Sequence, residues 1–208
     1  MIRHHPSEAT LLAQAAGHLP ALHARVLAVH LSACPHCRDE LHRLEELGGA
    51  LLAALPPAPL QPDALAHTLT RLDDEVVAPP PEAATTTAPV TLEALAVGRW
   101  WWLGPGIRLM PLSPRDASGT RLDLIRVAPG VALPGHGHTG PEMACILQGA
   151  YADETGAYSA YDIAEGDAAL DHTPVAAPGA DCICLIATTG RLRGHTWLAR
   201  LVQPLIGV

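Results

Sequence analysis

The sequence predicts an α+β protein of two domains, a small N-terminal bundle of three to four helices followed by an all-β barrel or jelly roll. Up to residue 76 the apolar residues recur every three or four positions, as they do in amphipathic helices. From residue 91 short apolar runs are separated by glycine and proline, which is typical of all-β folds. Residues 77–90 hold proline, alanine and threonine without a period, as in an extended spacer. We therefore expect domains at residues 1–76 and 91–208, joined by a linker at 77–90.

The first three helices have recognisable starts. Ser7 can cap a helix over residues 8–16. Pro20 opens a second helix that we expect to end near His30, and Pro35 opens a third, because proline suits the first helical position. The third helix carries an apolar stripe made of Cys37, Leu41, Leu44, Leu47, Leu51 and Leu52.

A fourth helix is predicted over residues 63–74, after a proline-rich hinge. Its apolar side is formed by Leu65, Leu69 and Leu72. An amphipathic helix detached from its bundle can dock in a groove of a partner protein, which makes these leucines candidate partner-binding residues. The sequence equally allows this helix to fold back on the first three.

A first candidate metal site has the pattern H-x3-C-x2-C, formed by His30, Cys34 and Cys37. Two thiolates and an imidazole suit zinc, and a closed tetrahedral zinc site needs one more ligand. His5 or its neighbour His4 is the candidate for the fourth position. Such a site would be structural, since three short helices bury little apolar surface without a cross-link.

Two other interpretations apply to the same cysteines. The run from Cys34 to Cys37 is also a redox motif of thioredoxin-like proteins, but that fold places a β-strand before the first cysteine. Here residues 19–28 have an alanine- and leucine-rich helical pattern instead. Alternatively, the two cysteines are small buried residues without a metal, although the nearby His30 argues against this.

The C-terminal half contains short apolar or weakly alternating runs at residues 100–102, 122–127, 143–147 and 182–186, which predict strands. We expect the three tryptophans at 100–102 in the core. Alternation along a strand would place Trp100 and Trp102 on one face and Trp101 on the other.

A second candidate metal site is the pattern formed by His136, His138 and Glu142. In extended backbone the two histidines point the same way, and the glutamate follows across a turn. His172 on a neighbouring strand would complete three imidazoles and a carboxylate, a set that suits zinc, iron, manganese or nickel. Any one of these histidines alone would more simply be a solvated or core residue, so the hypothesis depends on the set.

Composition excludes several classes of protein. The formal net charge is −8 and the chain has no lysine, which argues against direct binding of nucleic acid. The sequence has no run of 18 or more apolar residues, so it predicts no membrane span. Its N-terminus lacks the apolar core of a secretory signal, so no such segment is predicted either. The five cysteines are odd in number and two belong to a metal pattern, so we expect a reducing, cytoplasmic location.

The second metal pattern resembles the first cupin motif, G-x5-H-x-H-x3-E-x6-G, with every spacing intact at Gly130, His136, His138, Glu142 and Gly149. The second cupin motif is degraded. Ala164 stands where proline is usual, the gap from Gly166 to His172 is longer than usual, and no asparagine follows at the expected place.

A helical H-x3-C-x2-C domain followed by a cupin resembles the ChrR family of zinc-binding anti-sigma factors. Residues 2–5, 30–32 and 47–49 resemble the N-terminal domain of that family, and Cys182 and Cys184 resemble a cysteine pair in its cupin domain. The resemblance extends over both domains.

The resemblance implies a regulatory protein and not an enzyme. Its N-terminal domain would bind an extracytoplasmic-function sigma factor one to one, wedged between the two sigma domains. It would hold a structural zinc at His5, His30, Cys34 and Cys37. The cupin would hold zinc or another divalent metal at His136, His138, Glu142 and His172, and would release the sigma factor in response to singlet oxygen or organic hydroperoxides.

Within the cupin, Cys182 and Cys184 are candidate signalling residues or ordinary core residues. The alternative function is a metal-dependent cupin enzyme, a dioxygenase or isomerase with an accessory zinc domain, whose turnover would need His136 and Glu142. A third hypothesis is a thiol oxidoreductase that acts through Cys34 and Cys37.

Overall fold

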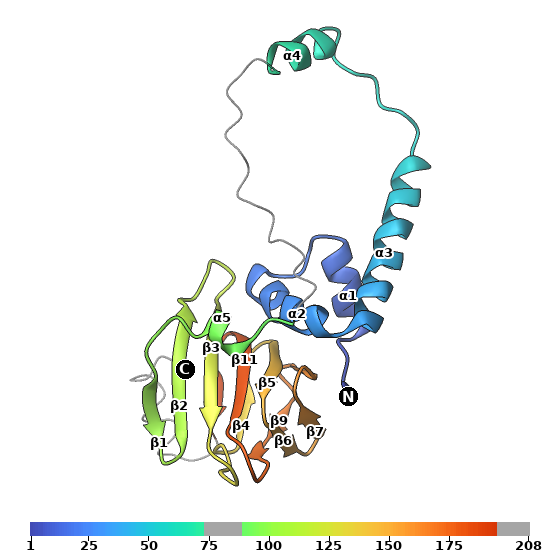
Figure 1. The fold of residues 1–208 in the computed structure, drawn as a ribbon. Coiled ribbons are helices and arrows are strands. Elements are labelled where there is room, and N and C mark those ends of the chain that lie inside the picture. Colours follow the sequence, from blue (N-terminus) through green and yellow to red (C-terminus); the bar gives the residue numbers. More distant parts are fainter. Residues whose placement is uncertain (73–88, 195–208) are drawn as a thin grey trace.

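The helices of the protein come first in the chain, as the computed structural model shows for the residues that it describes, 1–72 and 89–194 (Figure 1). Their bounds are α1 Glu8–Ala15, α2 Ala21–Ala33, α3 Pro35–Ala53, α4 Ala64–Thr70 and α5 Leu92–Leu95. The predicted starts of the first three helices are confirmed. The fourth is shorter than the predicted span of 63–74, and that span ends outside the described residues. The single turn of α5 was not predicted.

The local sequence explains the corner between α2 and α3. Cys34 has an extended backbone, with φ −108° and ψ 99°, so it ends α2 and caps the start of α3. Pro35 follows at the first position of α3, where the absence of an N–H costs nothing. At the start of α1, the side chain of Ser7 accepts a hydrogen bond from the backbone N–H of Thr10 at 3.3 Å. This corner brings the end of α2 and the first turn of α3 together.

The strands form three sheets among the residues that the structure describes. The largest has the order β1-β2-β3-β11-β5-β8, and the smaller ones have the orders β10-β6-β7 and β12-β4-β9. Their bounds are β1 Trp101–Gly104, β2 Ile107–Ser113, β3 Thr120–Val127, β4 His136–His138, β5 Glu142–Gln148, β6 Ala150–Asp153, β7 Gly156–Ser159, β8 Ile163–Gly166, β9 Asp171–His172, β10 Val175–Ala176, β11 Cys182–Thr189 and β12 Leu192–Gly194.

The all-β prediction for this half of the chain is confirmed, but a closed barrel is not formed. The register shifts between Ile183 and Cys184 where β11 pairs with β5, and β9 and β10 have only two residues each. Strands this short cannot carry the hydrogen-bond ladder around the circumference, so the sheets stay separate.

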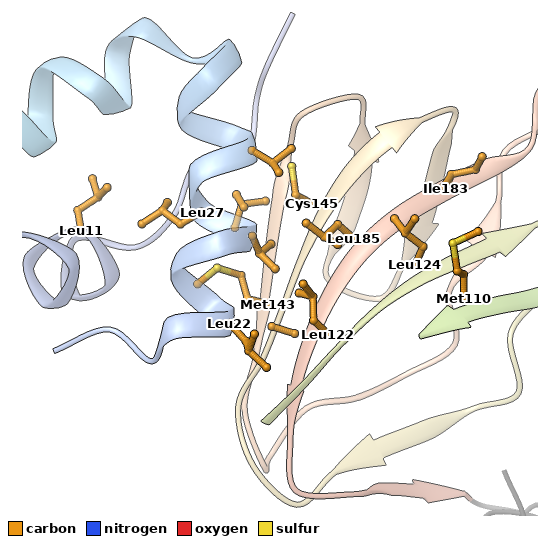
Figure 2. Packing of buried hydrophobic residues seen from close by; sticks show 14 residues of the cluster. Leu11, Leu22, Leu27, Met110, Leu122, Leu124, Met143, Cys145, Ile183 and Leu185 are labelled. Atoms are coloured by element: carbon orange, nitrogen blue, oxygen red, sulfur yellow. The ribbon is translucent and has the colours of Figure 1, made fainter. Parts of the chain in front are cut away.

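One hydrophobic core joins the helices to the large sheet. Helix α2 packs against β5, β11 and β3. Figure 2 shows Leu22 from α2 beside Leu122 and Met143 from the strands, with Leu27 on the side of α2 toward Leu11. Leu27 and Leu122 are completely buried. The helical and β regions therefore stabilise each other by direct burial of apolar surface.

The predicted linker, 77–90, lies outside the described residues except for its last two positions. Val90 is partly buried, and its N–H donates to the Oγ of Ser32 at 2.8 Å. The chain therefore enters the β region alongside α2.

Helices α3 and α4 leave this body of the protein. The first turns of α3 contact α1 and α2, while its later turns extend away from the sheet to α4 (Figure 1). Helix α4 buries none of its side chains, so it does not fold back on the bundle. Leu65, Leu69 and Leu72 are all exposed.

The expectation that the three tryptophans lie in the core is wrong for Trp101 and Trp102, and so is the expectation that Trp100 and Trp102 share a face. Trp100 packs against the core as expected, but both Trp101 and Trp102 are exposed. They lie on β1, which is at the edge of the large sheet, and the register with β2 shifts between Trp102 and Gly104. An edge strand has a neighbouring strand on one side only, so its side chains are covered less than those of a central strand. Within the described ranges, no helix has both the length and the apolar character needed to cross a membrane.

Two candidate metal centres

The first cluster lies at the corner between α2 and α3. His30 comes from the last turn of α2, Cys34 from the corner itself and Cys37 from the first turn of α3, and all three are buried. His5 approaches from the segment before α1, with its Nδ1 3.2 Å from the Sγ of Cys37 and 3.5 Å from the Sγ of Cys34. One potential ligand atom from each of these four residues lies within 4.8 Å of the others.

The protonation chemistry of this cluster fits a zinc ion. The Nδ1 of His30 is 2.7 Å from the carbonyl oxygen of Tyr161, and because a carbonyl only accepts, Nδ1 carries the proton. Its Nε2 then carries a free lone pair, and this atom is buried without a hydrogen-bond partner among the described residues. Burial lowers the pKa of His30 and raises the pKa of the Cys37 thiol to about 12. Bound zinc would supply the positive charge that favours thiolates in a site whose burial opposes them.

His4 lies elsewhere. Its Nε2 is 3.0 Å from the carbonyl oxygen of Ala157, and its ring lies against Tyr158 with the centroids 4.3 Å apart. Of the two histidines left open by the sequence, the structure therefore places His5 beside the cysteines. The thioredoxin-like interpretation is wrong, because the element before Cys34 is the helix α2 and not a strand.

The second cluster joins two strands of the β12-β4-β9 sheet. His136 and His138 lie on β4, and His172 on β9 pairs directly with His136. Ligand atoms of the three rings lie within 4.8 Å of one another, and the Nε2 atoms of His138 and His172 are 3.2 Å apart. Burial lowers the pKa of His136, and it lowers the pKa of His138 to about 4. Neutral imidazoles that converge in this way present lone pairs to a cation.

Hydrogen bonds orient two of these rings. The Nδ1 of His172 donates to the Oδ2 of Asp153 at 2.8 Å, and the Nδ1 of His136 lies 2.8 Å from the carbonyl oxygen of Pro134. Both contacts place the ring proton on Nδ1 and leave Nε2 free to bind a metal. Sequence reasoning missed Asp153. It lies 19 residues before His172, on β6 of another sheet, and no local spacing marks it.

Glu142 stands beside the three histidines but not among their converging atoms. Its Oε2 accepts a hydrogen bond from the Oγ1 of Thr188 at 2.8 Å and lies 3.5 Å from the Nδ1 of His138. Burial raises the pKa of this carboxyl group. The predicted set of four is thus brought together as three histidines with an adjacent glutamate.

Cys182 and Cys184 lie near the same centre. They point from β11 into a cavity of about 40 Å³ that is also lined by Glu142 and Tyr151. Both are buried, and their sulfur atoms are 3.7 Å apart. The bulge between Ile183 and Cys184 lies at this point of the strand. The contact with Cys182, together with burial, raises the pKa of the Cys184 thiol.

The helices carry a cluster of two histidines and two cysteines, and the β domain on which they pack carries a buried cluster of histidines. The protein is therefore of a class with two candidate metal centres, one in each region. Comparison with known proteins narrows this class. The ChrR cupin-like domain family matches residues 90–191. The chain is 40% identical over 213 residues to the anti-sigma-E factor ChrR of Cereibacter sphaeroides, a match that covers 100% of this chain and 99% of that protein.

The match extends to a solved structure. In the crystal structure of Rhodobacter sphaeroides SigE in complex with the anti-sigma ChrR, one chain is 40% identical to this one and superposes with a TM-score of 0.74, covering 90% of this chain and 99% of that chain. The protein therefore belongs to the ChrR family of anti-sigma factors. This is a regulatory family, which confirms the expectation that the protein is not an enzyme and sets aside the cupin dioxygenase or isomerase.

Proposed function

We propose that this protein binds an extracytoplasmic-function sigma factor in a one-to-one complex, keeps it from RNA polymerase, and releases it when oxidants act on the cupin-like domain. Its relative in Rhodobacter sphaeroides was crystallised with SigE, and the match to that relative extends over both regions of this chain. This similarity favours a sigma factor as the partner of this protein as well.

The observation that carries the proposal is a row of exposed leucines on α3, on α4 and in the segments that follow each of these helices. Its members are Leu47, Leu51, Leu52, Leu55, Leu60, Leu65, Leu69 and Leu72, and each is between 53% and 84% exposed. A protein rarely leaves so many large apolar side chains in water unless another protein covers them. Helical apolar faces of this kind dock in hydrophobic grooves of partner proteins, and here they would pack between the two sigma domains.

Zinc at His5, His30, Cys34 and Cys37 would have a structural role in this function. Four protein ligands close a tetrahedral site and leave no position for a substrate. Because His30 ends α2 and Cys37 begins α3, the metal would fix the angle at which α3 leaves the sheet. That angle sets the direction of the leucine row.

The cupin-like domain would sense the signal. His136, His138 and His172, with Glu142 beside them, would hold zinc or another divalent cation. Cys182 and Cys184 share a cavity with Glu142, so oxidation of the sulfurs would alter the surroundings of the metal. In this division of roles residues 1–76 bind the sigma factor, residues 91–208 respond to oxidants, and 77–90 link them.

The test uses the full chain, because α2 shares a core with the sheet and the helical part is not shown to fold alone. An extracytoplasmic-function sigma factor from the same organism is mixed with the protein, and the mass of the complex and run-off transcription are measured. We expect a one-to-one complex and loss of transcription, restored by singlet oxygen or an organic hydroperoxide. A sigma factor that neither binds nor loses activity would refute the proposal.

A further inference from the structure

The turn between β7 and β8, residues 159–163, contacts the first metal cluster from two sides. The carbonyl oxygen of Tyr161 accepts the hydrogen bond from the Nδ1 of His30. The Oδ1 of Asp162 accepts from the backbone N–H groups of Arg3, at 2.6 Å, and His4, at 3.0 Å. Arg3 and His4 directly precede His5, so a single turn of the β domain holds the backbone before one potential ligand and the ring of another.

The turn is built to present these acceptors in fixed directions. The side chain of Asp162 is completely buried, and its Oδ2 accepts from the N–H of Ser159 at 2.8 Å and from its Oγ at 3.0 Å. Tyr161 has a left-handed backbone, with φ 67°, which a residue other than glycine adopts only where its surroundings impose it. Here the N–H of Tyr161 donates to Ile146 and the N–H of Ile146 donates to Asp162, at 2.6 Å and 3.2 Å. The turn is thus fastened to β5.

Strand β8 continues this support along the N-terminal segment. Ile163 donates its N–H to the carbonyl oxygen of His4 at 3.1 Å. Glu165 accepts hydrogen bonds from the N–H of Ser7 at 3.0 Å and from the Oγ1 of Thr10 at 2.5 Å. Since β8 is the edge of the large sheet, the segment that carries His5 lies along a strand edge that is otherwise free within the described chain.

The other side of β8 leads to the second metal centre. It pairs with β5, and Gly166 at its end stands opposite Glu142. Strand β8 therefore begins at the turn that supports the first metal cluster and ends at Gly166, the residue paired with Glu142. A displacement of β8 relative to β5 would therefore move residues at both metal centres.

We propose that the turn 159–163, with Asp162 at its centre, is a positioning element of the zinc site, and that β8, which follows it, couples the two metal centres through its pairing with β5. The inference rests on the zinc binding of the proposed function. A histidine that binds a metal through one nitrogen is commonly oriented by a carbonyl or carboxylate at the other, and loss of such a support lowers metal affinity about 10- to 100-fold. Linkage makes the coupling reciprocal, so metal at either centre would change the metal affinity of the other by the same factor.

The first experiment compares Asp162→Asn with Asp123→Asn in the full chain. The amide keeps the size of the side chain but replaces one acceptor oxygen with an NH2 donor. The groups that donate hydrogen bonds to the Asp162 carboxylate can then no longer all find an acceptor. Asp123 is a buried carboxylate of the same sheet that pairs with Arg121. We expect Asp162→Asn to lose zinc to a coloured chelator about 10- to 100-fold more readily, and to alter the thiolate-to-metal absorption of the cobalt-substituted protein. Asp123→Asn should retain the wild-type spectrum.

A second pair of variants leaves the β domain unchanged. Arg3→Pro removes the N–H that donates to Asp162, whereas Ile2→Pro introduces the same ring one residue earlier. If Asp162→Asn does not fold, the comparison of Arg3→Pro with Ile2→Pro tests the inference instead. Zinc held as tightly by Arg3→Pro as by Ile2→Pro, with an unchanged cobalt spectrum, overturns the inference and leaves the proposed function intact. Wild-type protein without zinc at its cysteines overturns both.

Discussion

Asp153 and His172 are joined by a hydrogen bond of 2.8 Å between Oδ2 and Nδ1, although they lie on different sheets. The carboxylate fixes the proton on Nδ1 and points Nε2 at the other two histidines. We predict that Asp153→Asn lowers the affinity of the cupin-like domain for its divalent metal about 10- to 100-fold, because the amide supports the required tautomer less well. Equilibrium dialysis against cobalt or zinc measures this.

Glu154→Gln is the matched control for that experiment. Glu154 is the next residue, and its carboxylate accepts a hydrogen bond from the backbone N–H of Thr173 and not from a histidine ring. The metal affinity of the Glu154→Gln variant should equal that of the wild type. Equal affinities for Asp153→Asn and Glu154→Gln would show that the carboxylate does not orient His172.

The sequence could predict what depends on local spacing. The starts of α1, α2 and α3 follow from Ser7, Pro20 and Pro35, and the two metal patterns recur at intervals that a helix corner or a strand can bring together. The support of His30 by Tyr161 could not be predicted, because it joins residues 131 positions apart. The packing of α2 on the sheet is hidden for the same reason, since an apolar helix face does not specify its partner.

Replacement of Cys37 by serine should unfold the helices around the first centre. Structural zinc contributes an apparent free energy of about 10–16 kcal/mol in small domains, comparable to the stability of an entire domain. We expect Cys37→Ser to lose zinc and to expose α1 to α3 to protease, as seen by peptide mapping after limited digestion. His36→Ala changes an exposed residue of the same motif and should digest like the wild type. A Cys37→Ser protein with wild-type helix content and a cooperative melt would contradict this.

The leucines of α4 provide a direct test of the partner surface. Because Leu65 and Leu69 are exposed, Leu65→Glu with Leu69→Glu should leave the fold intact. Loss of this pair of apolar contacts should cost about 2 kcal/mol or more in total, so the Kd for the sigma factor should rise at least about 30-fold. Val97→Glu alters an exposed apolar residue outside the leucine row and should bind normally. Calorimetric titration gives both values, and unchanged binding by the double variant would remove α4 from the interface.

The shared core predicts that a mutation in a helix destabilises the β domain. Leu27 on α2 is fully buried in the core cluster that α2 shares with the strands, so Leu27→Ala should cost about 2–5 kcal/mol. Trp100 packs against the same cluster, and its fluorescence should report an earlier unfolding midpoint in urea. Leu52→Ala removes an exposed leucine of α3 and should change stability by less than about 0.5 kcal/mol. A tryptophan transition that Leu27→Ala leaves unmoved would mean that the two regions unfold independently.

The contact between Cys182 and Cys184 predicts a defined product of oxidation. With the sulfur atoms 3.7 Å apart, a hydroperoxide can oxidise one thiol to a sulfenic acid with release of an alcohol. The second thiol then displaces water and closes a disulfide between the two residues. We expect tert-butyl hydroperoxide to remove two alkylatable thiols from the full chain, found by mass spectrometry in a single linked peptide. Cys145→Ser should behave identically, because Cys145 is buried in the other core cluster with the helices. Cys184→Ser should stop at the sulfenic acid on Cys182. If Cys184→Ser releases the sigma factor as readily as the wild type, the disulfide has no part in signalling.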